Sequence, residues 1–168
     1  MGATGSEEGL KSTEANPKRA NTSILLIEDD EVLRGVLVLH LESCGYEVVA
    51  KADAEAAWEH LERAEGPWII ITDNQMPGLL GMELLERLCA RNALSGGCLL
   101  IGAVLMSGNI QPEQIGTVAA QLLALGVGFE FIGKPFGEDI LALCVERFIR
   151  EGTARGLFSH GKDVAGGA

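Results

Sequence analysis

The sequence predicts a single α/β domain built on a five-stranded parallel sheet with helices on both faces. Short runs rich in Ile, Leu and Val alternate along the chain with longer segments whose apolar residues recur at helical spacing. The central runs are apolar without alternation, which is typical of parallel strands buried on both faces. Because each parallel connection needs a crossover, five strands alternating with five helices predict a doubly wound sheet.

The first half of the domain supplies three strands and two helices. The strands are expected at residues 24–27, 46–50 and 68–72. A first helix is expected over 31–44, where apolar residues repeat with helical spacing until Gly45 stops it. A second helix is expected to run to about Ala64 with Asp53 as its N-cap, and Gly66-Pro67 separates it from the third strand.

The second half supplies two strands and three helices. Strands are expected at 98–106 and 128–132, and helices at 81–91, from 112 to near 126, and at 137–150. Pro112 occupies a position typical of the first turn of a helix. The predicted apolar stripe of that helix includes Val118, Leu122 and Leu123, and that of the last helix includes Ile140 and Phe148.

The two ends of the chain have a different composition. Residues 1–22 and 152–168 are rich in Gly and polar residues, so they bury too little apolar surface to offset the entropy of ordering. We therefore expect a disordered N-terminal arm and a flexible C-terminal tail around a folded domain of residues 23–151. Within the tail, Leu157 and Phe158 are able to dock locally.

Composition and charge exclude several classes of protein. The 24 Asp and Glu residues outnumber 13 Lys and Arg, and the net charge of -11 opposes binding to nucleic acid or to anionic membranes. The longest apolar run, 98–106, is too short to span a bilayer, and the N-terminus lacks the apolar segment of a secretory signal. The four cysteines show no C-x-x-C pairing. We therefore expect a cytoplasmic protein without membrane insertion or direct nucleic-acid binding.

Polar side chains follow four of the predicted strands. They are Glu28, Asp29 and Asp30 after the first strand, Asp73 after the third, Ser107 after the fourth and Lys134 after the fifth. Because the carboxyl ends of parallel strands meet at one edge of the sheet, we expect these side chains to lie together. Clustered carboxylates repel one another unless they share a cation, and oxygen ligands suit Mg²⁺ or Mn²⁺.

Such a site has the parts needed for phosphoryl transfer. A cation held by the carboxylates would organise an incoming phosphoryl group, whose remaining charge Lys134 would neutralise. Ser107 would donate a hydrogen bond to another phosphoryl oxygen. Asp73 is then the candidate nucleophile, because carboxylates form covalent phosphoryl intermediates. Asp30, in contrast, is expected to act as the N-cap of the first helix.

These motifs resemble those of the receiver domain of two-component response regulators, over about residues 23 to 150. The segment "ILLIEDDEVLR" carries the family's acidic pair, "DNQMPG" is similar to its D-x-x-M-P-G motif, and "KPF" follows the fifth strand. The resemblance implies a flavodoxin-like (βα)5 fold with Asp73 as phosphoacceptor. It implies Asp29 as a direct metal ligand, Glu28 as a ligand acting through water, and the backbone carbonyl of Gln75 as a further ligand.

The resemblance also assigns the residues of a conformational switch. It implies Ser107 as the switch hydroxyl, Lys134 as the phosphate-binding lysine with a cis peptide bond to Pro135, and Phe131 as the aromatic switch residue. Receivers often carry tyrosine there, and phenylalanine keeps the ring but loses the hydroxyl hydrogen bond. The intervals from Asp73 to Ser107 and on to Lys134 are longer than usual, and we expect the extra length in "NALSGG" and between 109 and 128.

The function implied is that of an apparently stand-alone, chemotaxis-regulator-like receiver. It would accept a phosphoryl group from a sensor histidine kinase or a histidine phosphotransfer protein and signal to a downstream protein target. Apart from self-phosphorylation and slow autodephosphorylation, no enzymatic activity is expected.

Three alternatives stand beside this interpretation. One is a degenerate receiver that binds proteins without phosphorylation. Another is a Mg-dependent phosphatase of the haloacid-dehalogenase type, but such enzymes typically show D-x-D where this chain has Asp73-Asn74-Gln75. The last is a flavodoxin-like nucleotide binder, although no glycine-rich phosphate loop follows the first strand, where "EDDE" would repel phosphate. The combination of acid pair, acceptor and lysine favours the phosphorylatable receiver.

Overall fold

The predicted strands form one parallel sheet. The computed structural model describes residues 22–64, 66–95, 99–109 and 112–157, and its strand order is β2-β1-β3-β4-β5. The strands are β1 (Ser23–Ile27), β2 (Glu47–Lys51), β3 (Pro67–Asp73), β4 (Leu99–Ser107) and β5 (Gly128–Gly133). The helices are α1 (Glu31–Ser43), α2 (Ala54–Arg63), α3 (Gly81–Ser95), α4 (Pro112–Ala124) and α5 (Asp139–Ala154). The predicted doubly wound α/β fold is therefore confirmed.

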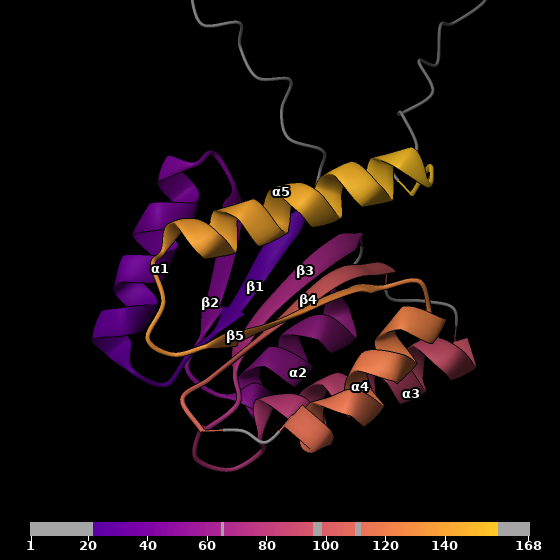
Figure 1. Cartoon of the computed structure of the whole chain (residues 1–168), viewed down its shortest axis with the longest axis horizontal. Coiled ribbons are helices and arrows are strands. Elements are labelled where there is room, and N and C mark those ends of the chain that lie inside the picture. Colours follow the sequence, from indigo (N-terminus) through magenta and orange to yellow (C-terminus); the bar gives the residue numbers. More distant parts are fainter. Residues whose placement is uncertain (1–21, 65, 96–98, 110–111, 158–168) are drawn as a thin grey trace, which may run out of the picture.

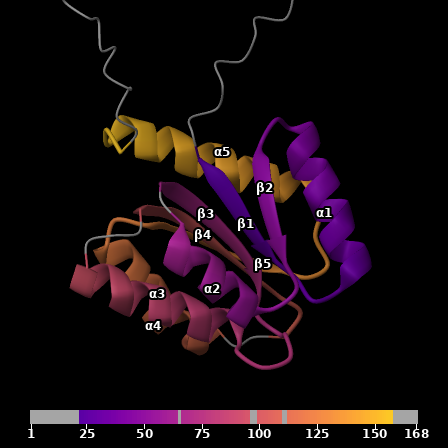
Figure 2. The same ribbon diagram turned by 180° about the vertical axis from the view of Figure 1, so that it is seen from behind.

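Helices cover both faces of the sheet. The helices α1 and α5 lie on one face, and α2, α3 and α4 lie on the other (Figures 1 and 2). Alternate residues of β1 serve the two cores, because Leu25 and Ile27 pack toward α2–α4 whereas Ile24 and Leu26 pack toward α1 and α5. All four are fully buried, and each such side chain contributes about 1.5–3 kcal/mol of transfer free energy. Within the described residues, no helix combines the length and apolarity that a membrane span requires.

Two helices extend beyond their predicted ends. The helix α3 was expected to stop at Arg91 but continues to Ser95, so most of "NALSGG" prolongs a helix and does not form a loop. The helix α5 begins at Asp139 and continues to Ala154, past the predicted end at Arg150.

The helix α5 thus continues past residue 151, where the folded domain was expected to end. Gly152 is buried within α5, and Leu157 packs against the core beneath α1 and α5. At the other end Thr22, assigned to the N-terminal arm, is buried beside β1. The rest of the predicted disordered ends, residues 1–21 and 158–168, lies outside the described residues.

The register between β3 and β4 contains one irregularity. Trp68 pairs with Leu100, whereas the next residue, Ile69, pairs with Gly102. One extra residue in β4 therefore opposes β3, as in a β-bulge. As a result, Ile101 and Gly102 both face α5.

The ring of Phe148 packs α5 directly onto the backbone of β4 and β5. Gly102 and Gly128 are paired across these two strands. A Cβ atom at Gly102 would lie 2.2 Å from Phe148 Cδ2, and one at Gly128 would lie 2.5 Å from Phe148 Cδ1. The fully buried ring thus occupies a hollow that exists because both residues lack side chains.

We expect Gly102→Ala to lower the free energy of unfolding by about 1–3 kcal/mol, because the new methyl group overlaps the Phe148 ring. Urea denaturation measures the change. Gly35→Ala on α1 is the matched control, since no atom lies within 4 Å of a Cβ there, and it should stabilise the protein by about 0.5–1 kcal/mol. Stabilisation by both substitutions would contradict the tight packing of Phe148 on the sheet.

Candidate functional site

The residues singled out in the sequence gather at the carboxyl edge of the sheet. Asp73 and Ser107 are the last residues of β3 and β4, and Lys134 directly follows β5. Glu28 and Asp29 directly follow β1. Because the four strands are parallel, all these side chains start from the same edge.

Backbone hydrogen bonds extend the sheet past the strand ends at this edge. The N–H of Asn74 donates to the carbonyl of Met106 over 2.8 Å. The N–H of Lys134 donates to the carbonyl of Ser107, also over 2.8 Å. The residues that carry the polar side chains are therefore fixed relative to one another by the sheet itself.

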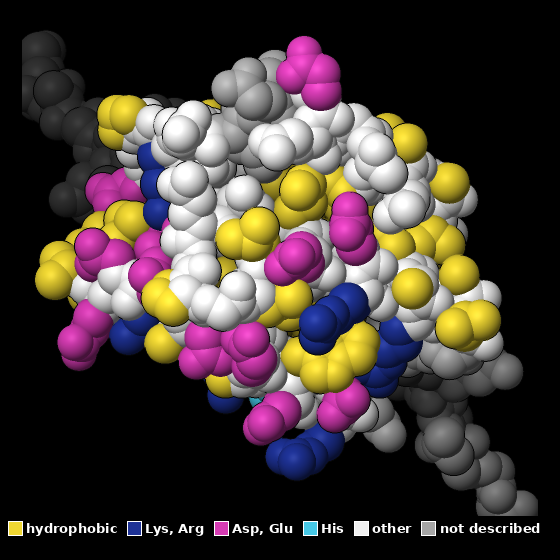
Figure 3. Space-filling view, turned by 90° about the horizontal axis from the view of Figure 1, so that it is seen from below, with side chains coloured by type: hydrophobic (Ala, Val, Ile, Leu, Met, Phe, Trp, Pro, Cys, Tyr) yellow, Lys and Arg dark blue, Asp and Glu magenta, His cyan; other side chains and the backbone are white. Residues whose placement is uncertain are grey.

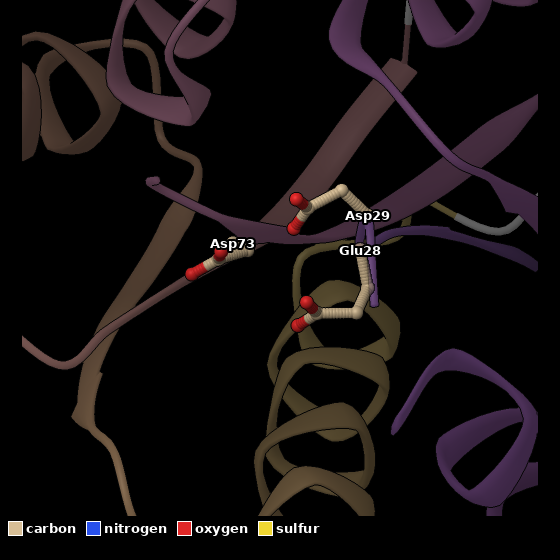
Figure 4. A group of neighbouring side chains, drawn as sticks. All are labelled: Glu28, Asp29 and Asp73. Atoms are coloured by element: carbon tan, nitrogen blue, oxygen red, sulfur yellow. The ribbon is translucent and has the colours of Figure 1, made fainter. Parts of the chain in front are cut away.

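Three carboxylates share one space. Glu28 and Asp73 are only 1% and 4% exposed, whereas Asp29 is exposed. One oxygen from each lies within 4.8 Å of the others. Figure 4 shows Glu28 and Asp29 leaving neighbouring positions after β1, with Asp73 on the adjacent strand.

The donor set fits a hard divalent cation. Asp73 Oδ1 is buried, and its one cationic neighbour among the described residues is the Lys134 ammonium, 3.2 Å away. All three side chains offer oxygen, the donor that Mg²⁺ and Mn²⁺ prefer. Among the described residues, these three form the one cluster of acidic, His or Cys side chains with such spacing. Glu28, Asp29 and Asp73 are thus suited to hold Mg²⁺ or Mn²⁺.

Asp30, the third acid of the run, has a different role. Its Oδ1 accepts the N–H groups of Val32 and Leu33, each over 2.9 Å, so it caps α1 as expected. In the same turn, Arg34 Nη1 donates to the carbonyl of Glu28 over 2.7 Å. This arginine, to which sequence analysis gave no role, fixes the backbone that carries the two ligand candidates.

The ammonium group of Lys134 lies between two carboxylates. Its Nζ is 2.8 Å from Glu28 Oε2 and 3.2 Å from Asp73 Oδ1. The contact with Glu28 is a hydrogen bond, and the contact with Asp73 is an ion pair. Side chains from the ends of β1 and β3 therefore both contact the positive charge of the lysine that follows β5.

Burial and charge act in opposite directions on this group. Partial burial alone lowers the pKa of Lys134, but the hydrogen bond to Glu28 and the negative charge of Asp73 outweigh it, and the pKa is raised. Burial raises the pKa of Glu28, and the hydrogen bond and charge of Lys134 only partly compensate. The lysine is thus a firmly charged cation beside a carboxylate that is costly to ionise.

The predicted switch residues are also near this edge. Ser107 is 1% exposed, and its Oγ accepts the N–H of Asn109 over 3.3 Å. Phe131 is half-buried on β5 and packs against the core beneath α2–α4. Gln75 lies in the loop that follows β3, with its side chain exposed. The peptide bond from Lys134 to Pro135 is cis, as the family resemblance implied.

Asn74 and Gly81 were not assigned roles from the sequence. Asn74 is buried, its Oδ1 accepts the N–H of Met82, and its carbonyl accepts the N–H of Gly81. A Cβ atom on Gly81 would lie 2.1 Å from the carbonyl oxygen of Asp73. Both residues therefore fix the backbone on either side of Asp73. A glycine at the start of a helix, eight positions after an acidic strand end, was the available signal.

Comparison with known proteins gives the family. The sequence profile described as "Response regulator receiver domain" matches residues 24–146. The C4-dicarboxylate transport transcriptional regulatory protein DctD of Pseudomonas aeruginosa is 32% identical over 132 residues, which cover 78% of this chain and 26% of DctD. The transcriptional regulatory protein FixJ of Bradyrhizobium diazoefficiens is 31% identical over 128 residues, which cover 76% of this chain and 57% of FixJ.

Solved structures share the fold. The chemotaxis protein CheY4 of Vibrio cholerae aligns with a TM-score of 0.59 and 22% identity, covering 76% of this chain and 98% of that structure. In contrast, the chain spans about a quarter of DctD and little more than half of FixJ. The family profile and the fold together show that the chain belongs to the response regulator receiver domain family.

Proposed function

We propose that this receiver accepts a phosphoryl group on Asp73 from a phosphohistidine, carried by a sensor histidine kinase or a histidine phosphotransfer protein. One observation carries the proposal. The buried Oδ1 of Asp73 lies 3.2 Å from the Lys134 ammonium and belongs to a carboxylate that has an oxygen within 4.8 Å of those of Glu28 and Asp29. Such a group is a nucleophile beside a fixed positive charge.

The chemical step exchanges one phosphorus bond for another. An oxygen of Asp73 forms a bond to phosphorus while the bond between phosphorus and the imidazole nitrogen breaks, and that nitrogen keeps the electron pair. The product is an aspartyl phosphate, whose slow hydrolysis returns the free carboxylate. The protein acts mainly by positioning and by neutralising charge, as is general for phosphoryl transfer.

Each neighbouring residue has a role in this step. Glu28, Asp29, Asp73 and the Gln75 carbonyl would hold Mg²⁺ or Mn²⁺, which supplies positive charge to the phosphoryl oxygens. Lys134 already contacts Asp73, so a phosphoryl group there meets the ammonium without a large backbone movement. Ser107 would donate a hydrogen bond to a phosphoryl oxygen.

Phosphorylation is proposed to shift the protein between two conformations. The hydroxyl of Ser107 would turn toward the new charge, and the half-buried Phe131 ring would move further into the core. The face seen from below carries both acidic and basic side chains (Figure 3), and the net charge of -11 opposes contact with nucleic acid. The proposed downstream target is therefore a protein, and the proposed compartment is the cytoplasm.

Incubation with acetyl phosphate and Mg²⁺ should add one phosphoryl group to the protein, as read by intact mass. Asp73→Asn should abolish the addition because it removes the nucleophile, and chelation of Mg²⁺ should strongly reduce it. Asp139→Asn is the matched control, since this carboxylate is 91% exposed and outside the acid cluster. An unchanged parent mass would favour a phosphorylation-independent binding module, and multiple turnover of small phosphate esters would favour a phosphatase.

Lys134→Met should destabilise the metal-free protein, because Glu28 and Asp73 then face each other without a cation between them. The expected loss in free energy of unfolding at pH 7 is about 1–3 kcal/mol, and added Mg²⁺ should restore part of it. Urea denaturation with chelator and with Mg²⁺ measures both values. Lys51→Met is the control, since Lys51 has no ion pair among the described residues. A loss for Lys51→Met as large as that for Lys134→Met would argue against this role.

Ser107→Ala should allow phosphorylation but weaken its conformational effect, because the hydroxyl that would contact the phosphoryl group is missing. The NMR signals of the Phe131 ring, compared before and after phosphorylation, report the effect. They should move in the parent and stay nearly constant in the variant. Equal changes of these signals in both proteins would show that the response of the Phe131 ring does not depend on the Ser107 hydroxyl.

A further inference from the structure

Four consecutive backbone N–H groups, two at the end of the loop between β3 and α3 and two at the start of α3, each have a defined acceptor. Leu79 donates to Glu55 Oε1 over 3.2 Å, Leu80 to Glu83 Oε2 over 2.9 Å, Gly81 to the Asn74 carbonyl over 3.2 Å and Met82 to Asn74 Oδ1 over 3.0 Å. The first N–H groups of a helix need such partners. Three of these acceptors belong to the loop or to α3, and one belongs to α2.

The acceptor on α2 is Glu55. Its carboxylate also packs against Gly78, because a Cβ atom there would lie 3.0 Å from Oε1 and 3.3 Å from Oε2. Gly78 has a φ of 85°, a backbone conformation that favours glycine. Glu55 thus contacts two successive residues of the loop, including the N–H that directly follows this turn.

The start of α2, which carries Glu55, is itself fixed. Glu55 is in the first turn of α2, where Asp53 Oδ1 accepts the N–H of Ala56 over 2.7 Å. In the loop itself, the side chains of Met76 and Leu79 are buried in the core beneath α2–α4. The loop is therefore fixed from the core by two apolar side chains and from α2 by one carboxylate.

We infer that Glu55 is a positioning residue for the phosphoryl site. By fixing Gly78 and Leu79, it restricts the backbone that runs from Asp73 through Gln75, so that the carbonyl assigned to the cation is in place before the cation binds. This inference rests on the function proposed above, because it takes Gln75 as a ligand. A ligand group that is already ordered loses less entropy on binding, and groups that orient metal ligands influence metal affinity.

Three substitutions separate positioning from charge. Glu55→Ala removes the acceptor, whereas Glu55→Gln removes the charge but keeps an oxygen that can accept the N–H of Leu79. Glu59→Ala is the matched control, since Glu59 is an exposed carboxylate one turn further along α2 and has no hydrogen bond or ion pair among those found in the described chain. It changes the net charge as Glu55→Ala does.

The main measurement is the Mg²⁺ dissociation constant of the full chain, by isothermal titration calorimetry. Glu55→Ala should weaken binding about fivefold, while Glu55→Gln and Glu59→Ala should stay within about twofold of the parent. At saturating Mg²⁺, the rate of phosphorylation by acetyl phosphate should stay within about twofold of the parent in all three variants. The loss should therefore appear in the Mg²⁺ dependence and not in the maximal rate.

A second measurement needs no metal. Amide hydrogen exchange followed by NMR should be about tenfold faster at Leu79 in Glu55→Ala than in the parent, because the N–H loses its acceptor. The amide of Leu80, which donates to Glu83, is the internal reference and should keep its rate.

The outcomes that overturn the inference are distinct from those that overturn the proposed function. Unchanged Mg²⁺ affinity in Glu55→Ala, or an equal loss in Glu59→Ala, would overturn the positioning role alone while the parent still binds Mg²⁺ and accepts a phosphoryl group. A parent protein that binds no Mg²⁺ and gains no phosphoryl group would overturn both.

Discussion

The contact of one ammonium group with two nearly buried carboxylates is the interaction on which the candidate site depends. Lys134 reaches from the end of β5 across the end of β4 to Asp73 on β3 and to Glu28 after β1. Taking carboxylates out of water costs several kcal/mol each unless a cation compensates. The lysine provides part of this compensation, since the pKa of Glu28 stays raised even beside it. The three carboxylates still offer a cation oxygen atoms that lie within 4.8 Å of one another.

Much of this arrangement was predictable because apolar strands that end in polar residues are a strong local signal. The fold and the meeting of Glu28, Asp73 and Lys134 follow from strand ends and parallel topology alone. The prediction of which helix residues are buried was less accurate, because periodicity does not show how a helix is rotated about its axis relative to the sheet. Leu123 and Ile140, both placed on the apolar stripes of their helices, are 63% and 41% exposed. Helix ends were missed where tertiary packing continues the helix, as at Gly152, which is buried within α5 beyond the expected end at Arg150.

The residues that hold the site in place escaped sequence reasoning for a different reason. Glu55, Asn74 and Arg34 form hydrogen bonds with backbone groups. Every residue type has a backbone carbonyl and nearly every type a backbone N–H, so the sequence does not show which residue is the partner. Glycine in a strand is likewise expected to weaken it. Only the packed structure shows that Gly102 and Gly128 together make room for an aromatic ring.

The amide groups at the start of α3 have a consequence for the electrostatics of the whole edge. A helix N-terminus often attracts anions, because its free N–H groups form the positive end of the helix macrodipole. Here the N–H groups from Leu79 to Met82 are already engaged by Glu55, Glu83 and Asn74, and two of these partners are themselves anions. The macrodipole of α3 is thus neutralised locally. The positive charge that meets an anion at Asp73 would then come from Lys134 and from dissolved cations, which would make its capture sensitive to the ionic composition of the surrounding solution.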